Sequence, residues 1–282
     1  MRILIEPEDL GRLEQPVCLV DARAEVDYDA GHVPGALHLD TFEFSNEQTE
    51  GEQLDSVLAE WHEMFLEAGI PADETVVFYD AGTENRGSRP ALMMRALGHE
   101  RSHVLHGGMT RWIEDGGAVS TVPERRERES WERRPGTTAV VGLDAVRSVL
   151  DSPDVVLLDV RSEGEYTGEM SMQGNPRLGH LPRARHLDWR SLIEHRSEWP
   201  AGAGTPRDGD QLLYRLLPPD QLWDRLAAVG VGPRSEVMIY CQKSHRASVV
   251  YVALETLGVH TACVYAGSFR EWSRRPDAPI EG

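Results

Sequence analysis

Cysteines and long apolar runs are scarce in this sequence of 282 residues. It has three cysteines, Cys18, Cys241 and Cys263, with no CxxC spacing, which excludes an evenly paired disulfide framework. No apolar run approaches the ~20 residues of a membrane helix, and the N-terminus lacks a secretory signal pattern. We therefore expect a cytoplasmic protein with no membrane partner. No His, Cys, Asp or Glu cluster has metal-ligand spacing, so we expect no metal and no cofactor.

Basic residues are also in deficit. The 47 acidic residues exceed the 29 basic ones and give a formal net charge of −18. Such a balance argues against a nucleic-acid partner, because the phosphate backbone attracts basic surfaces. A small anionic substrate would need a locally basic pocket.

The sequence is internally repeated, and the repeat predicts the fold. Strands alternate with helices in each half, which is typical of βαβ units around a parallel sheet. We predict an α/β protein of two tandem domains, each a mostly parallel sheet flanked by helices. The matched segments are VCLVDAR (17–23) with VVLLDVRS (155–162), GHVPGALHLD (31–40) with GHLPRARHLDW (179–189), and VVFYD (76–80) with VMIYC (237–241).

The dense mixed charge of residues 125–138 predicts a solvated linker between domains at 1–124 and 139–282. The second half carries two extra segments, 169–179 and 195–213. Loops of that length in a compact domain tend to be functional or mobile.

Cys241 is the candidate nucleophile. It follows the buried strand Val237–Tyr240 and precedes a helix, where backbone N–H groups and the helix dipole favour a thiolate. Lys243, His245 and Arg246 add positive charge nearby. The repeat aligns Asp80 with Cys241, which confines this chemistry to the second half.

Other residues occur in both halves and are interpreted as structural. We expect Cys18 and Cys263, which lie in apolar strand-like runs, to be buried and inert. The remaining structural candidates are the Asp21/Arg23 and Asp159/Arg161 pairs, His32 and His180 in the GH-Pro turns, and the packing anchors Trp112 and Trp272. His245 is present only in the second half, and substrate contact, stabilisation of the thiolate or plain solvent exposure would each suit it.

The motifs DVRS, GHLPRA, YCQKSHR and YAGSFREW, in this order, resemble the rhodanese family of sulfurtransferases. The duplicated layout resembles its tandem two-domain, thiosulfate sulfurtransferase-like members, and the resemblance extends from about Leu19 to Trp272. It implies a catalytic C-terminal domain in which Cys241 cycles between thiolate and persulfide. It also implies a non-catalytic N-terminal domain, in agreement with Asp80, which cannot accept a sulfane sulfur.

The family's six-residue active-site loop corresponds here to Cys241 and the substrate-binding candidates Gln242, Lys243, Ser244, His245 and Arg246. A cation two places after the cysteine, here Lys243, resembles the members that act on thiosulfate. Ser244 departs from the glycine frequent in the family. Glu165 stands about where some members place a substrate-binding arginine, and a carboxylate there would weaken the binding of a dianion.

The resemblance implies transfer of a sulfane sulfur from a small anionic donor, thiosulfate, to a thiol or cyanide acceptor. Two alternatives remain, a mercaptopyruvate sulfurtransferase and a persulfide carrier or interaction module with little turnover. A phosphatase of related fold would need a cysteine loop one residue longer, ending on arginine. Here Arg246 is five positions after Cys241 and Ala247 follows, which argues against phosphate chemistry.

Overall fold

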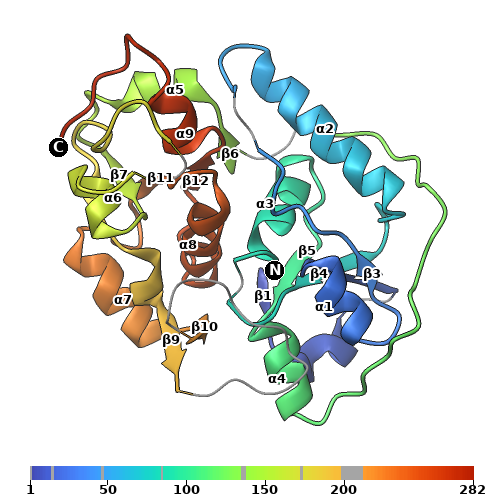
Figure 1. Ribbon diagram of the computed structural model, residues 1–282. Coiled ribbons are helices and arrows are strands. Elements are labelled where there is room, and N and C mark those ends of the chain that lie inside the picture. Colours follow the sequence, from blue (N-terminus) through green and yellow to red (C-terminus); the bar gives the residue numbers. More distant parts are fainter. Residues whose placement is uncertain are drawn as a thin grey trace. The chain divides into compact units, whose positions relative to one another are not determined.

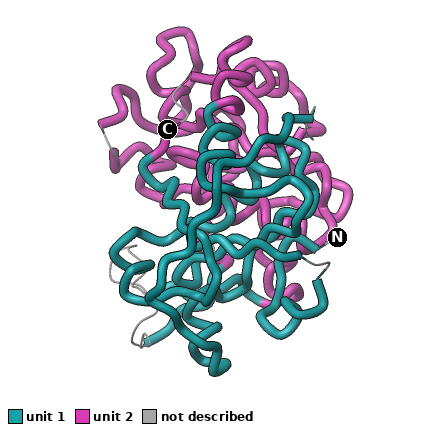
Figure 2. Tube along the Cα trace, turned by 90° about the vertical axis from the view of Figure 1, so that its right-hand side faces the viewer, with its two compact units in different colours: residues 1–43, 60–137, 193–217 teal, residues 44–59, 138–192, 218–282 magenta. Residues whose placement is uncertain are grey.

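The computed structural model describes residues 2–13, 16–45, 48–83, 85–134, 138–171, 174–197 and 212–282 (Figure 1). The chain forms two compact units, coloured separately in Figure 2. Unit 1 comprises residues 1–43, 60–137 and 193–217, and unit 2 comprises residues 44–59, 138–192 and 218–282. Each half of the sequence therefore gives one segment to the unit built mainly by the other half. The domain boundaries predicted from the sequence repeat, 1–124 and 139–282, stay a prediction.

Unit 1 is built on a parallel five-stranded sheet with the order β1-β5-β4-β2-β3. Its strands are β1 (Leu4–Ile5), β2 (Val17–Asp21), β3 (Leu37–His38), β4 (Thr75–Tyr79) and β5 (Ser102–Leu105). Its helices are η1 (Pro7–Arg12), α1 (Glu25–Ala30), α3 (Ser88–Ala96), α4 (Gly108–Glu114) and the later part of α2 (Gln53–Glu67).

Unit 2 repeats this sheet with the order β6-β12-β11-β7-β8. Its strands are β6 (Val140–Val141), β7 (Val155–Asp159), β8 (Arg185–His186), β11 (Glu236–Tyr240) and β12 (Ala262–Tyr265). Its helices are α5 (Leu143–Val149), α6 (Glu163–Thr167), η2 (Trp189–Leu192), α7 (Pro219–Ala228), α8 (His245–Thr256) and α9 (Ser268–Trp272). The predicted α/β fold with two parallel sheets is confirmed.

The central strand of each unit is apolar and buried. All five residues of β4 are buried, as are the last four of β11. Helices cover both faces of a parallel sheet, so its inner strands lack polar alternation. In unit 2, α8 runs beside β11 and β12 (Figure 1). The predicted anchor Trp272 is fully buried in the core of this unit.

Part of the predicted loop 195–213 is strand. An antiparallel hairpin of β9 (Ile193–Arg196) and β10 (Leu212–Leu216) lies in unit 1, and residues 198–211 fall outside the described residues. Tyr214 of β10 packs beside Gly82 and Gly107, where an added Cβ atom would lie 3.4 and 3.3 Å from its side chain. The hairpin thus covers the loop that follows β4.

Candidate active site

Cys241 lies directly after β11, the central strand of the unit 2 sheet. Strand β11 pairs with β7 up to the Tyr240–Asp159 register, so Cys241 lies at the carboxyl edge of the sheet. Ligands of open α/β sheets bind at this edge. The cysteine is 1% exposed, and the loop Cys241–Ser244 leads directly into α8.

The short helix α9 holds the cysteine loop in place. The backbone N–H groups of Phe269 and Arg270 donate to the carbonyls of Cys241 (2.9 Å) and Gln242 (3.1 Å). Ser268 Oγ accepts the N–H groups of Cys241 (3.3 Å) and Ser244 (3.1 Å) and donates to a carbonyl of β12 (2.9 Å). One hydroxyl thereby uses its donor and both acceptor positions to close the loop.

Two serines of this site adopt left-handed backbone conformations. Ser244 has φ 67° and Ser268 has φ 51°, and both are fully buried. Non-glycine residues in this region carry strain, which persists where the surroundings enforce it and is common at functional sites. The conformation explains why a glycine suits position 244. It also shows that serine is accommodated there.

Arg246 is held by Glu165 of α6. Its two terminal nitrogens lie 2.7 and 3.0 Å from the two carboxylate oxygens, a bidentate pair. Ser162 adds its backbone N–H and hydroxyl to the same carboxylate. Burial alone would raise the pKa of Glu165, but the hydrogen bond and charge of Arg246, with the Ser162 donors, lower it to about 2. The carboxylate therefore offsets one cation that the sequence assigned to substrate binding.

The matching loop of unit 1 already holds an anion. The carboxylate of Asp80 accepts the backbone N–H groups of Gly82 (2.7 Å) and Arg86 (2.8 Å). Burial, only partly offset by these N–H groups, raises its pKa. A loop of this design thus directs its N–H groups at the side chain that occupies the cysteine position.

The other predicted loop residues are placed as follows. Gln242, 4% exposed, exchanges two side-chain hydrogen bonds with Asn175, at 3.0 and 2.7 Å. Lys243 is half-buried. His245, the first residue of α8, is 8% exposed, so the alternative of plain solvent exposure is wrong.

Most of the residues interpreted as structural make contacts that agree with this interpretation. The predicted ion pairs are buried, with Arg23–Asp21 at 2.6 Å and Arg161–Asp159 at 2.5 Å. Cys18 is buried, whereas Cys263, which was expected to be buried, is half-buried. Burial raises the pKa of both thiols to about 12, which disfavours the reactive thiolate. His32 and His180 each bond a backbone carbonyl at 2.8 Å through Nδ1.

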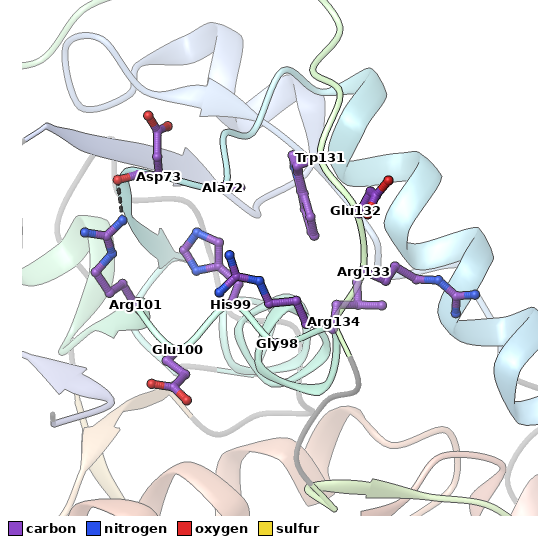
Figure 3. Close-up of a pocket in the computed structure, with 11 residues that line it drawn as sticks. Ala72, Asp73, Gly98, His99, Glu100, Arg101, Trp131, Glu132, Arg133 and Arg134 are labelled. Carbon is purple, nitrogen blue, oxygen red and sulfur yellow. Dashed lines mark hydrogen bonds between the residues drawn. The ribbon is translucent and has the colours of Figure 1, made fainter.

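A pocket of about 770 Å³ lies in unit 1 and is drawn in Figure 3. It does not contain Cys241, which belongs to unit 2. In Figure 3 the ring of His99 lies between Arg101, which bonds the Asp73 backbone carbonyl, and Arg134. Three arginines and three acidic residues line the pocket, so its charges balance: Arg101, Arg133 and Arg134 against Asp73, Glu100 and Glu132.

Among the described residues, no group of three or more His, Cys, Asp or Glu side chains is placed to hold a metal ion. Within the same part of the chain, every helix is too short or too polar to cross a membrane.

The Rhodanese-like domain model matches the chain twice, at residues 7–115 and 143–275, and the chain belongs to this family. A thiosulfate sulfurtransferase of Azotobacter vinelandii is 28% identical over 99% of this chain and 97% of its own length. A 3-mercaptopyruvate sulfurtransferase of Escherichia coli (strain K12) is 26% identical over 93% of this chain and 87% of its own length.

Solved structures show the same fold. A probable thiosulfate sulfurtransferase matches with a TM-score of 0.72 and 27% identity, over 96% of this chain and 99% of that chain. The wild-type structure of EanB matches with a TM-score of 0.73 and 25% identity over 95% of this chain. The present chain covers 64% of EanB, less than two thirds of its length.

Two contributors to the site were not assigned from the sequence. Ser268 aligns with Gly108 of the first half, and both have similar left-handed φ values, 51° and 50°. A hydroxyl present only in the cysteine-containing copy was the available signal. Asn175 lies in the extra segment 169–179, where the repeat offers no counterpart for comparison.

Proposed function

We propose that this protein is a sulfurtransferase that moves a sulfane sulfur from thiosulfate to a thiol or cyanide through a persulfide on Cys241. The observation that supports this proposal most directly is the loop of unit 1, in which backbone N–H groups bind the Asp80 carboxylate. The same loop design around Cys241 would stabilise a thiolate or persulfide anion. Family membership and the relatives named as sulfurtransferases support the same reaction class.

The reaction proceeds in two displacements. The Cys241 thiolate attacks the outer sulfur of thiosulfate, the S–S bond of the donor breaks, and sulfite leaves with the bonding electron pair. Cyanide or a thiolate then attacks the terminal sulfur of the persulfide, which regenerates the Cys241 thiolate and releases thiocyanate or the acceptor persulfide. Lys243 would provide positive charge for the donor sulfonate, together with Arg246, whose charge Glu165 partly offsets. Cys241 must start reduced, which accords with a cytoplasmic setting.

Mercaptopyruvate is a second candidate donor, and the Glu165–Arg246 pair favours it. The pair offsets one loop cation, which penalises the dianion thiosulfate more than a donor with one carboxylate. The relative from Escherichia coli named 3-mercaptopyruvate sulfurtransferase supports this alternative.

Steady-state kinetics with cyanide as acceptor tests both candidates. We expect turnover with thiosulfate in the wild type, higher kcat/KM for thiosulfate than for mercaptopyruvate, and no turnover in Cys241→Ser. Cys263→Ser is the matched control and should behave as wild type. A higher kcat/KM for mercaptopyruvate would reassign the donor. Negligible turnover with either donor, despite a sulfur-loaded Cys241, would indicate a persulfide carrier instead.

A further inference from the structure

Unit 2 contains an insertion beside the cysteine loop that the first half lacks. In both halves an arginine after a strand donates to the carbonyl of the glycine that opens the GH-Pro turn. These partners, Arg23 with Gly31 and Arg161 with Gly179, are 8 and 18 residues apart, so ten residues, 169–178, are inserted in the second half.

Arg177 anchors the insertion to the support of the cysteine loop. Its guanidinium donates to backbone carbonyls at and beyond the C-terminal end of α9, those of Trp272, Ser273, Arg275 and Ala278. A guanidinium carries five N–H donors, and a cation at a helix C-terminus is favourable. The same helix α9 holds Cys241 through Ser268, so the insertion and the cysteine loop share one support.

Asn175 contacts the cysteine loop itself. Its amide N–H donates to Gln242 Oε1 at 3.0 Å, and its carbonyl accepts from Gln242 Nε2 at 2.7 Å. This reciprocal pair binds both polar ends of a side chain that is 4% exposed. The residue next to Cys241 is therefore fixed by its side chain as well as by its carbonyl, which accepts the N–H of Arg270.

The peptide between residues 242 and 243 is the unit that this pair restrains. A peptide is planar, so the N–H of Lys243 points away from the Gln242 carbonyl. In the first half the matching peptide has its Ala81 carbonyl bound by Thr110 N–H (3.2 Å), and its Gly82 N–H donates to the Asp80 carboxylate (2.7 Å). The same geometry at the 242–243 peptide would direct the N–H of Lys243 toward the sulfur of Cys241.

We propose that Asn175 is a positioning residue for sulfur transfer: by holding the Gln242 side chain, it keeps the 242–243 peptide turned so that its N–H faces the Cys241 sulfur. This role rests on the proposed function. The first half has Asp80 at the cysteine position, and it has neither the insertion nor a side chain at Ala81 that could be held in this way.

The test measures the single-turnover rate of sulfur loading from thiosulfate by quenched-flow mass spectrometry. We expect Asn175→Ala to load about three- to tenfold more slowly, with the half-saturating thiosulfate concentration within about twofold of wild type. Asn175→Asp keeps the acceptor for Gln242 Nε2 but loses the donor, so it should load at an intermediate rate. Met170→Ala, at a residue of the same insertion that is 53% exposed, is the matched control and should load as wild type.

A double-mutant cycle separates this role from general stabilisation. The variant with both Asn175→Ala and Gln242→Ala should load no more slowly than the slower single variant, because both changes remove one interaction. Wild-type loading rates in Asn175→Ala and Asn175→Asp, or fully additive effects in the cycle, would overturn the role of Asn175. A wild-type protein that takes up no sulfur on Cys241 would instead overturn the proposed function.

Discussion

At the scale of single residues, the pairing of Glu165 with Arg246 determines how much positive charge the cysteine loop offers a substrate. The sequence placed both residues near the donor, but the bidentate contact was not predicted, because 81 residues separate them in the chain. The position of Cys241 at the end of a buried strand could be predicted because its strand, loop and helix are contiguous and repeated. Its role as the nucleophile stays a prediction.

The first prediction concerns Glu165→Gln. Loss of the carboxylate leaves the Arg246 charge without its counterion, which should lower the free energy of unfolding by about 3 kcal/mol. The exposed Glu163→Gln on the same helix is the control and should change it by less than about 0.5 kcal/mol. Urea denaturation of the two variants measures both values, and equal midpoints would contradict the importance of the pair.

The same pair predicts a pH dependence. The folded-state pKa of Glu165, about 2, lies below its ordinary value, so folding favours the ionised form. Its contribution to stability is complete above about pH 4.3 and is lost as the pH falls toward 2. Between these values, the stability difference between wild type and Glu165→Gln should shrink. A difference that stays constant from pH 5 to pH 2 would argue against this assignment.

Position 244 gives a prediction about backbone strain. Ser244→Gly should raise the free energy of unfolding by about 0.5–1 kcal/mol, because glycine adopts the φ of 67° without a Cβ penalty. Ser244→Ala retains the Cβ and should give no such gain. Thermal unfolding compares them, and equal stability of the glycine and alanine variants would rule out strain as the relevant quantity.

At the scale of elements, α9 connects the cysteine loop to a segment from the first half of the sequence. Glu271 of α9 is 1% exposed and accepts hydrogen bonds from the backbone N–H (2.7 Å) and the hydroxyl (2.6 Å) of Thr49. Thr49 lies in the segment 44–59, which belongs to unit 2. Tyr265 of β12 also donates to this carboxylate. Hydrophobic periodicity located the strands and helices, but the contacts between Thr49 and Glu271 join residues 222 positions apart.

Thr49→Val tests this connection. Removal of the hydroxyl leaves the buried Glu271 carboxylate one donor short, which should cost about 1–3 kcal/mol of stability. Thr49→Ser keeps the hydroxyl and serves as the control. In guanidinium denaturation the free energy of unfolding of the valine variant should be lower than that of the serine variant. The opposite order would show that the hydroxyl is dispensable.

At the scale of the whole molecule, the two halves of the sequence form similar folds, but each compact unit also includes a segment from the other half. The repeat in the sequence was sufficient to predict two parallel α/β sheets, and it also predicts that the chemistry is confined to one of them. It could not predict that residues 44–59 belong to unit 2 and residues 193–217 to unit 1. Neither segment is among those whose sequences match between the two halves.

The isolated fragment 139–282 should therefore be unstable. It lacks residues 44–59, which supply Thr49 to Glu271 and Glu50 to Arg147 (2.5 Å) and Arg275 (3.0 Å). We expect its thermal midpoint to fall by at least about 5 °C relative to the full chain. Calorimetry of both proteins makes the comparison, and an unchanged midpoint would show that the exchanged segment contributes little.

Mass spectrometry of the intact protein after treatment with thiosulfate is the most direct test of sulfur transfer through Cys241. The wild type should gain one sulfur atom per chain, located on the peptide that contains Cys241, and cyanide should remove it with release of thiocyanate. Cys241→Ser should gain none. Absence of added sulfur in the wild type, or its attachment to Cys18 or Cys263, would contradict the account.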